Sequence, residues 1–224
     1  KIKKGLEIHY DGDLPAKSGM GSSSAFLVGL LKSLYSYNKI KISNFELSKK
    51  AIFIEQQVLR ENVGIQDQVS CACGGFNNLK FSKNKIVLKK INLSIDSKIK
   101  LNSNLFLVYS KIQRRAHDIA NTFTKTIKKK KTDIYEILDH VKIAKKLLYA
   151  QDFDSFGELL GESWKIKKKL SNSVSNDLID RKYNEAVKSG AIGGKILGAG
   201  GGGFFLFYVP KKNHDKFKKK FLKK

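Results

Sequence analysis

The order of hydrophobic and polar positions predicts short strands and amphipathic helices in the first half of the chain. Leu6 to Tyr10 alternates apolar and polar residues, which predicts a half-buried strand. The apolar run at residues 26–34 predicts a buried helix that ends near Tyr37. Ser43, followed three positions later by Glu46, has the form of a capping box and predicts a helix that reaches Arg60. One face of that helix is apolar, with Leu47, Ala51, Ile54 and Val58.

The second half continues this mixture of strands and helices. Residues 80–88 predict a hairpin, and residues 104–110 and 204–209 predict buried strands. Helices are predicted at 133–150, 152–170 and 175–188, and a last one from Lys211 with Phe217 and Phe221 on its buried side. The pattern weakens at residues 89–104, so we place a boundary there between domains at 1–97 and 98–224.

Length and cysteine content set broad limits. A chain of 224 residues can form one large or two small domains with a proper core. Cys71 and Cys73 form C-x-C in an apolar segment without companion ligands, so we expect two small buried residues and no zinc site. No apolar run approaches the roughly 18 residues that span a bilayer. We therefore expect a soluble, cytoplasmic protein without a membrane partner.

The formal net charge is +24, from 44 Lys and Arg against 20 Asp and Glu. A nucleic-acid-binding protein would gather Arg and aromatic residues on one face, whereas here Lys dominates and is spread along the chain. We interpret the charge as a solvated, Lys-rich surface and do not expect a nucleic-acid partner. A polyanionic partner remains the alternative, and anionic substrates would be attracted in either case.

Candidate chemistry begins with PAKSGMGSSSA at residues 15–25, which directly precedes the first long apolar run. Gly19 and Gly21 let backbone amides approach a ligand, and the free amides and dipole of a helix N-terminus favour an anion such as phosphate. The following serines, 22–24, could cap the helix, bind phosphate oxygens or ligate magnesium. The loop matches neither a Walker A sequence nor a nucleophile elbow. A Ser-capped helix after a flexible turn is the alternative.

A second glycine-rich segment lies at residues 193–203, GGKILGAGGGG. Gly198, Gly200 and Gly203 satisfy G-x-G-x-x-G, but a dinucleotide fingerprint must open a helix. Here the apolar run 204–209 predicts a strand instead. The segment is therefore interpreted as a turn between two strands, and a purely structural glycine hairpin would look the same.

The two glycine-rich segments together resemble the second and third motifs of the GHMP kinases, a family of small-molecule kinases. The second motif, P-x-x-x-G-L-G-S-S-A, corresponds to Pro15–Ser24, with Met20 for Leu and Ser24 for Ala. The third, K-x-x-G-A-G-x-G-G, corresponds to Lys195–Gly203. The resemblance implies an α+β, two-domain fold, with an N-terminal part like the second domain of ribosomal protein S5 and a ferredoxin-like C-terminal domain. The family's first motif lies upstream of the second, so the chain looks N-terminally truncated.

The resemblance also implies a site. Gly64-Ile65-Gln66-Asp67 ahead of Gly74-Gly75 matches the segment whose Asp acts as the base toward the substrate hydroxyl. Glu55 matches the acidic residue that holds Mg²⁺, together with Ser23 or Ser22. Arg114 partly matches an Arg that would clamp a substrate phosphate, and Gly200 and Gly201 are assigned to the substrate side. The ATP phosphates are assigned to Lys17, Ser18, Gly19, Met20, Gly21, Ser22, Ser23 and Ser24.

The implied activity is transfer of a phosphoryl group from ATP to a phosphorylated sugar. Residues 64–77 and 197–208 look most like the family members that phosphorylate the anomeric hydroxyl of D-glycero-D-manno-heptose 7-phosphate. Two alternatives stay open, namely a kinase for another sugar, of the fucose or galactose type, and a non-catalytic basic protein that binds a polyanion. The sequence leaves the oligomeric state open, with a homodimer as one candidate.

Overall fold

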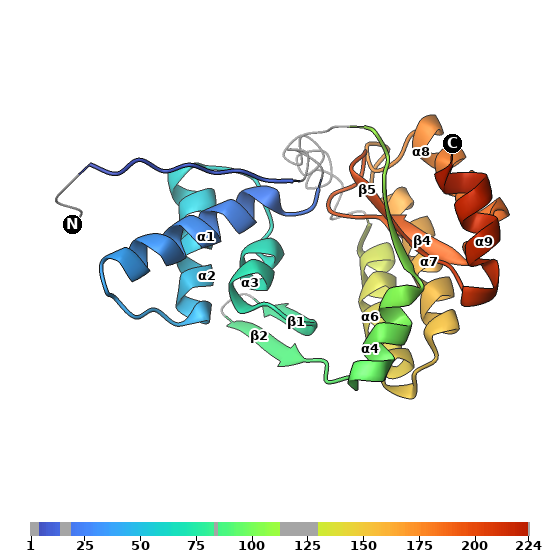
Figure 1. The fold of residues 1–224 in the computed structure, drawn as a ribbon, viewed down its shortest axis with the longest axis horizontal. Coiled ribbons are helices and arrows are strands. Elements are labelled where there is room, and N and C mark those ends of the chain that lie inside the picture. The colour runs from blue at the N-terminus through green and yellow to red at the C-terminus, as the bar shows by residue number, and fades with distance from the viewer. Residues whose placement is uncertain (1–4, 14–18, 83–84, 113–129, 224) are drawn as a thin grey trace. The chain divides into compact units, whose positions relative to one another are not determined.

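The computed structural model describes residues 5–13, 19–82, 85–112 and 130–223, and the chain divides into two compact units, residues 1–90 and 91–224 (Figure 1). Helices combine with two separate antiparallel sheets. The expected α+β, two-domain architecture is therefore confirmed, while the boundary at residues 97 and 98 stays a prediction. In the described part of the chain, no helix is both long and apolar enough to cross a bilayer.

The first unit contains three helices and one hairpin. Helix α1 (Ser22–Tyr37) packs with α2 (Asn44–Phe53) and α3 (Gln66–Cys73). The strands β1 (Asn77–Ser82) and β2 (Lys85–Lys90) pair antiparallel, as expected for the predicted hairpin. Val28, Leu47 and Ala51 form a small buried core.

The N-terminus of α2 is as the sequence predicts. The Ser43 hydroxyl accepts a hydrogen bond from the backbone N–H of Glu46 at 3.2 Å, and the Glu46 carboxylate accepts one from the backbone N–H of Ser43 at 3.4 Å. This reciprocal pair satisfies two amides that the helix cannot.

The helix does not continue to Arg60 as a regular α-helix. From Ile54 to Val58 the chain forms a π-helical turn, η1, which carries one residue more per turn than an α-helix. Within this turn the side chains are rotated relative to the predicted face: Glu55 is 2% exposed, whereas Val58 is 59% exposed. The expectation that Val58 belongs to the apolar face is therefore wrong.

Three further expectations for this unit are wrong. Leu6 to Tyr10 is not a strand, because no strand in the described part of the chain pairs with it, and its apolar side chains are exposed. Helix α1 is buried only along its contact with α2 and α3, at Ser24 and Val28. Cys71 is exposed and Cys73 half-buried, because the short helix α3 turns Gln68 and Val69 into the core instead.

The second unit is built on a three-stranded antiparallel sheet in the order β3-β5-β4. Its strands are β3 (Leu105–Tyr109), β4 (Gly193–Ile196) and β5 (Phe204–Tyr208). The segment from β4 to β5 confirms the predicted strand-turn-strand arrangement. The helices are α4 (Ile95–Ser103), α6 (Lys131–Ala150), α7 (Phe153–Leu170), α8 (Asp177–Lys188) and α9 (His214–Phe217), the last between the short turns η3 (Lys211–Asn213) and η4 (Lys218–Leu222).

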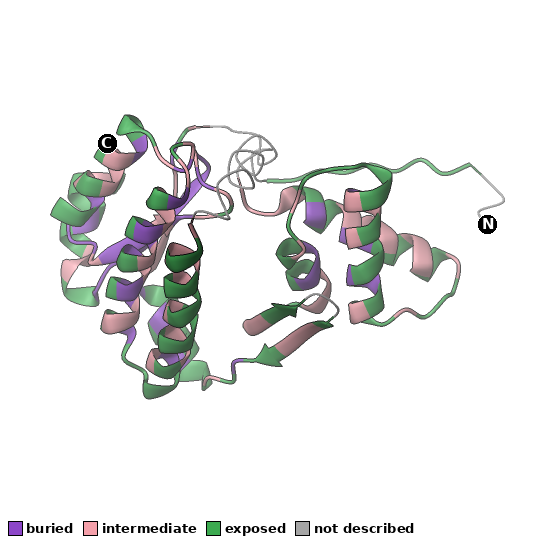
Figure 2. Ribbon diagram, turned by 180° about the vertical axis from the view of Figure 1, so that it is seen from behind, coloured by how far each residue is buried: buried purple, intermediate pink, exposed green. Residues whose placement is uncertain are grey.

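Strand β5 supplies the core on both faces of this sheet, because successive side chains of a strand point to opposite sides. Phe205 and Phe207 are fully buried in a cluster that includes Phe217, as predicted for the last helix. Tyr208 lies in a second cluster that includes Leu148 and Phe153. Figure 2 shows the buried residues of this unit gathered along the strands and the helices that cover them.

Candidate active site

The carboxyl group of Asp67 lies directly beside the glycine-and-serine loop. Asp67 is in the first turn of α3, and Gly21 is the residue that caps the N-terminus of α1. A Cβ atom placed on Gly21 would meet Asp67 Oδ2 at 3.3 Å and Cγ at 3.4 Å. Gly21 also has φ of +71°, a conformation that glycine adopts without strain. The candidate base and the candidate phosphate loop, 46 positions apart in the sequence (67 − 21), are thus in contact distance within one unit.

Glu55 lies in the same cluster and is buried. The Ser24 hydroxyl donates to Glu55 Oε1 at 3.1 Å and to Oε2 at 3.2 Å, and Ser23 Oγ lies 3.5 Å from Oε1. The side-chain amide of Gln68 donates to Glu55 Oε2. These partners are all neutral. Buried carboxylate oxygens that are held by neutral donors can serve as ligands for a cation.

The two carboxylates influence each other. Burial, and then the negative charge of Glu55, raise the pKa of the Asp67 carboxyl above its ordinary value. Asp67 as a whole residue is exposed, and its carboxyl lies beside Gly21. The same two charges, after burial, raise the pKa of the Cys71 thiol. A raised pKa makes the Asp67 carboxylate a stronger proton acceptor once it is ionised.

The N-terminus of α1 begins at a glycine cap. Gly19 has φ of +75°, and Gly21 caps the helix without a side-chain hydrogen bond to its first turn. A Ser-capped helix, which the sequence left open, is therefore not what forms. The amides of the first helical turn have no acceptor within the helix, so they can bind phosphate oxygens. Ser22 and Met20 are half-buried beside them, and Ser23 is exposed.

The remaining predicted residues are not part of this cluster. Lys17, Ser18 and Arg114 lie outside the described residues. Gly200 and Gly201 belong to the second unit, where both have positive φ. The Gly201 amide donates to the carbonyl of Val174 at 2.7 Å, and the Gly203 amide to that of Ile112 at 2.9 Å. Their assignment to the substrate side stays a prediction.

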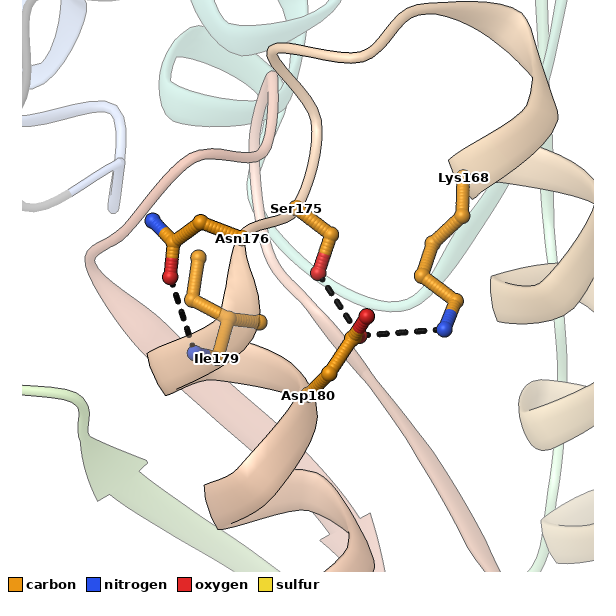
Figure 3. A network of polar contacts seen from close by, with 5 residues as sticks. All are labelled: Lys168, Ser175, Asn176, Ile179 and Asp180. Carbon is orange, nitrogen blue, oxygen red and sulfur yellow. Dashed lines mark hydrogen bonds and ion pairs between the residues drawn. The ribbon is translucent and has the colours of Figure 1, made fainter.

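Val174, whose carbonyl accepts the hydrogen bond from Gly201, directly precedes residues that make polar contacts at the N-terminus of α8. The Asn176 side chain caps that helix by accepting from the Ile179 amide at 2.9 Å. Asp180 accepts from the Ser175 hydroxyl at 2.8 Å and pairs with Lys168 of α7 at 3.0 Å (Figure 3). The third motif is therefore hydrogen-bonded to the loop between α7 and α8, and this loop is held in place by side chains at the ends of both helices.

The donor set around Glu55 fits magnesium. Mg²⁺ prefers oxygen ligands and is usually held by one or two carboxylates together with substrate phosphates. Glu55 and the Ser23 hydroxyl supply such oxygens beside the loop that would receive the phosphates. Among residues 5–13, 19–82, 85–112 and 130–223, no group of three or more His, Cys, Asp or Glu could hold a metal alone. The site therefore suits an ion shared with the nucleotide.

Sequence reasoning missed how Glu55 is held. Ser24 was assigned to the phosphates, but its hydroxyl bonds Glu55. Gln68 received no role, although it is 1% exposed and its amide contacts the same carboxylate. The available signal was the position of Gln68, a polar residue directly after the candidate base and before an apolar segment.

Comparisons with known proteins agree with this arrangement. The GHMP kinases N terminal domain matches residues 1–75, and the GHMP kinases C terminal domain matches residues 144–224. D-glycero-alpha-D-manno-heptose 7-phosphate kinase of Campylobacter jejuni is 33% identical over 217 residues, which cover 95% of this chain and 64% of that protein. Mevalonate kinase of Methanocaldococcus jannaschii is 24% identical over 222 residues, which cover 99% and 67%.

Solved structures give the same picture. A D-glycero-D-manno-heptose 1-phosphate kinase from Bacteroides thetaiotaomicron superposes with a TM-score of 0.72 at 26% identity, over 93% of this chain and 58% of that one. The chain thus spans about three fifths of the length of these two heptose kinases. Both halves of one family match in their usual order, with the Asp67, Glu55 and Gly21 cluster inside the first match. The chain therefore belongs to the GHMP kinase family.

Proposed function

We propose that the protein transfers the γ-phosphoryl group of ATP to the anomeric hydroxyl of D-glycero-D-manno-heptose 7-phosphate and forms the 1,7-bisphosphate. The observation that carries the proposal is the contact between the Asp67 carboxyl and Gly21, because it puts a proton acceptor beside the candidate phosphate loop. The similarity to a heptose 7-phosphate kinase supports the choice of sugar.

Asp67 orients the sugar hydroxyl and accepts its proton. As the hydroxyl oxygen forms its bond to the γ-phosphorus, the bond from that phosphorus to the bridging oxygen breaks, ADP leaves with the electron pair, and the proton goes to Asp67. The raised pKa of Asp67 suits this acceptance. Positioning supplies most of the rate, because the transferred group passes through a loose transition state.

The loop and Glu55 bind and help to neutralise the negative charge of the ATP phosphates. The amides from Gly19 to Ser23 hold the phosphates at the N-terminus of α1, where the helix dipole favours anions. Glu55 and Ser23 would hold Mg²⁺, which neutralises phosphate charge when bound. Ser24 and Gln68 donate hydrogen bonds to the Glu55 carboxylate. Arg114, Gly200 and Gly201 remain candidates for the sugar and its phosphate.

Several other acceptors compete with heptose 7-phosphate as the substrate. The relative from Bacteroides thetaiotaomicron carries the name of a heptose 1-phosphate kinase, and other relatives are galactokinases and mevalonate kinases. The contact between Asp67 and Gly21 would serve any of these acceptors, because it places only the transferred phosphate and the attacking oxygen. The acceptor must therefore be established by assay.

The test is a panel of acceptors assayed for ADP release with MgATP. Heptose 7-phosphate is compared with unphosphorylated heptose, galactose, fucose and mevalonate at equal concentrations. We expect release with heptose 7-phosphate and much less with unphosphorylated heptose, because the 7-phosphate provides charge for recognition. A preference for galactose, fucose or mevalonate would refute heptose 7-phosphate as the substrate. Salt-sensitive binding to DNA without acceptor-dependent ADP release would refute the kinase and favour the polyanion-binding alternative.

A further inference from the structure

We infer that Gln68 is a positioning residue that orients Glu55 for the metal-nucleotide complex. The inference rests on the proposed function and deepens it, since it assigns a role to a residue that touches neither substrate directly. Three features of Gln68 support it: a contact with Glu55, nearly complete burial, and a place in the chain directly after Asp67.

The contact is specific in direction. An ionised carboxylate can only accept hydrogen bonds, so the side-chain amide of Gln68 must turn its nitrogen toward Glu55 Oε2. The opposite orientation would place two acceptors against each other. Glu55 Oε1 and Oε2 are both also reached by Ser24. Gln68 therefore completes a set of donors from two helices that leaves the carboxylate little freedom to rotate.

A buried amide is unfavourable at the position of Gln68 unless it has a specific partner. Its side chain is 1% exposed, and its Oε1 atom is buried without a hydrogen-bond partner in the described part of the chain. An unpaired buried carbonyl oxygen costs stability, on the order of 1–3 kcal/mol. An apolar residue of similar size would avoid that cost. The amide is retained here in spite of it, which a role at Glu55 explains.

The position of Gln68 in the chain also links the placement of Glu55 to that of Asp67. Gln68 and Asp67 are neighbours in the first turns of α3, so one rigid element carries the candidate base and the donor that holds Glu55. Glu55 lies in the π-helical turn η1, whose backbone departs from regular helix. Such turns often occur at functional sites. A side-chain contact from α3 fixes Glu55 relative to Asp67 where the local helix alone does not.

The test compares Gln68→Met with the matched control Gln56→Met. Methionine fills a similar volume but cannot donate a hydrogen bond. Gln56 directly follows Glu55 in η1, and its amide donates to the Val63 carbonyl at 2.8 Å instead of to Glu55. The affinity for Mn²⁺ is measured by electron paramagnetic resonance with a non-hydrolysable ATP analogue. Thermal unfolding of both variants is recorded in parallel.

We expect Gln68→Met to weaken Mn²⁺ binding about tenfold, as is common for loss of an outer partner of a metal ligand. Gln56→Met should leave it unchanged although it also loses one hydrogen bond. If Gln68→Met does not fold, Gln68→Asn gives the same comparison, because its amide is one methylene too short. Unchanged Mn²⁺ affinity in the Gln68 variant, equal weakening in the Gln56 variant, or no Mn²⁺ binding by the parent protein would overturn the inference.

The proposed function can be refuted independently of the role of Gln68. A parent protein that binds Mn²⁺ and nucleotide but releases no ADP with any sugar would contradict the kinase activity, while the effect of Gln68 on metal binding could still be measured. In the active protein, a positioning role predicts that Gln68→Met raises the KM for Mg²⁺ and leaves the KM for the sugar unchanged. Equal changes in both would indicate general structural damage and count against the inference.

Discussion

The Asp67 carboxyl lies so close to Gly21 that a side chain at position 21 would have to move it by a few tenths of an ångström. An added Cβ would lie 3.3 Å from Asp67 Oδ2 and 3.5 Å from Asp67 Cβ. The backbone at Gly21 is left-handed as well, with φ of +71°. Two independent constraints thus require glycine where the loop enters α1.

Gly21→Ala is expected to lower both stability and turnover. The left-handed backbone alone costs an alanine roughly 1–2 kcal/mol, and the methyl group would displace the Asp67 carboxyl. The matched control is Gly29→Ala in the same helix, where an added Cβ meets nothing within 4 Å. That change should raise stability slightly, because alanine favours helix interiors over glycine. Chemical denaturation and an ADP-release assay measure both effects; equal behaviour of the two variants would contradict this account.

The raised pKa of Asp67 predicts a specific pH dependence of stability. Since burial and Glu55 raise its pKa in the folded protein, the folded state binds the proton more tightly than the unfolded chain. The stabilising contribution is therefore full at low pH and is lost as pH rises through the folded pKa. Asp67→Asn should have a higher Tm than the parent at neutral pH without metal, and the difference should shrink toward about pH 4. A Tm difference that is constant with pH would contradict this.

The capping box at Ser43 gives a test of the first unit that is independent of activity. Ser43→Ala removes the acceptor for the Glu46 amide and should cost about 1 kcal/mol of stability. Ser33 is the control, because its hydroxyl only bonds the Gly29 carbonyl within α1. Ser33→Ala should be neutral or slightly stabilising. Urea unfolding compares them, and the cap would have no energetic role if both variants unfolded at the same urea concentration.

The contact between β4 and α7 tests the second unit. A Cβ on Gly193 would clash with the carbonyl oxygen of Gly157, so the helix and the strand would have to separate. Gly193→Ala should therefore destabilise this unit by about 3 kcal/mol or more. At Gly64 an added Cβ meets nothing within 4 Å, and Gly64→Ala serves as the control. Circular dichroism on heating would refute the packing argument if Gly193→Ala melted like the parent.

The sequence predicted the features that depend on local signals. The Ser43 capping box, the β1–β2 hairpin and the strand-turn-strand at residues 193–208 follow from spacing and composition over a few positions. The expected strand at Leu6 to Tyr10 is wrong because its pairing depends on a neighbouring strand that local alternation cannot reveal.

The site could be predicted only in part for a similar physical reason. Resemblance to the family brought Asp67, Glu55 and the glycine loop together, and the structure places all of them in one cluster. The π-helical turn at Glu55 and the contact from Gln68 depend on packing between α1, α2 and α3. Such packing is not encoded in the periodicity of any single helix.

The central claim is that Asp67 accepts the proton of the sugar hydroxyl beside the phosphate loop. The most direct measurement is the rate of phosphoryl transfer from ATP to heptose 7-phosphate in a rapid-quench experiment with the parent and Asp67→Asn. We predict that the rate falls by about 10² to 10⁴, while the Kd for ATP without magnesium stays the same. A transfer rate equal to that of the parent would contradict the role of Asp67 and the account built on it.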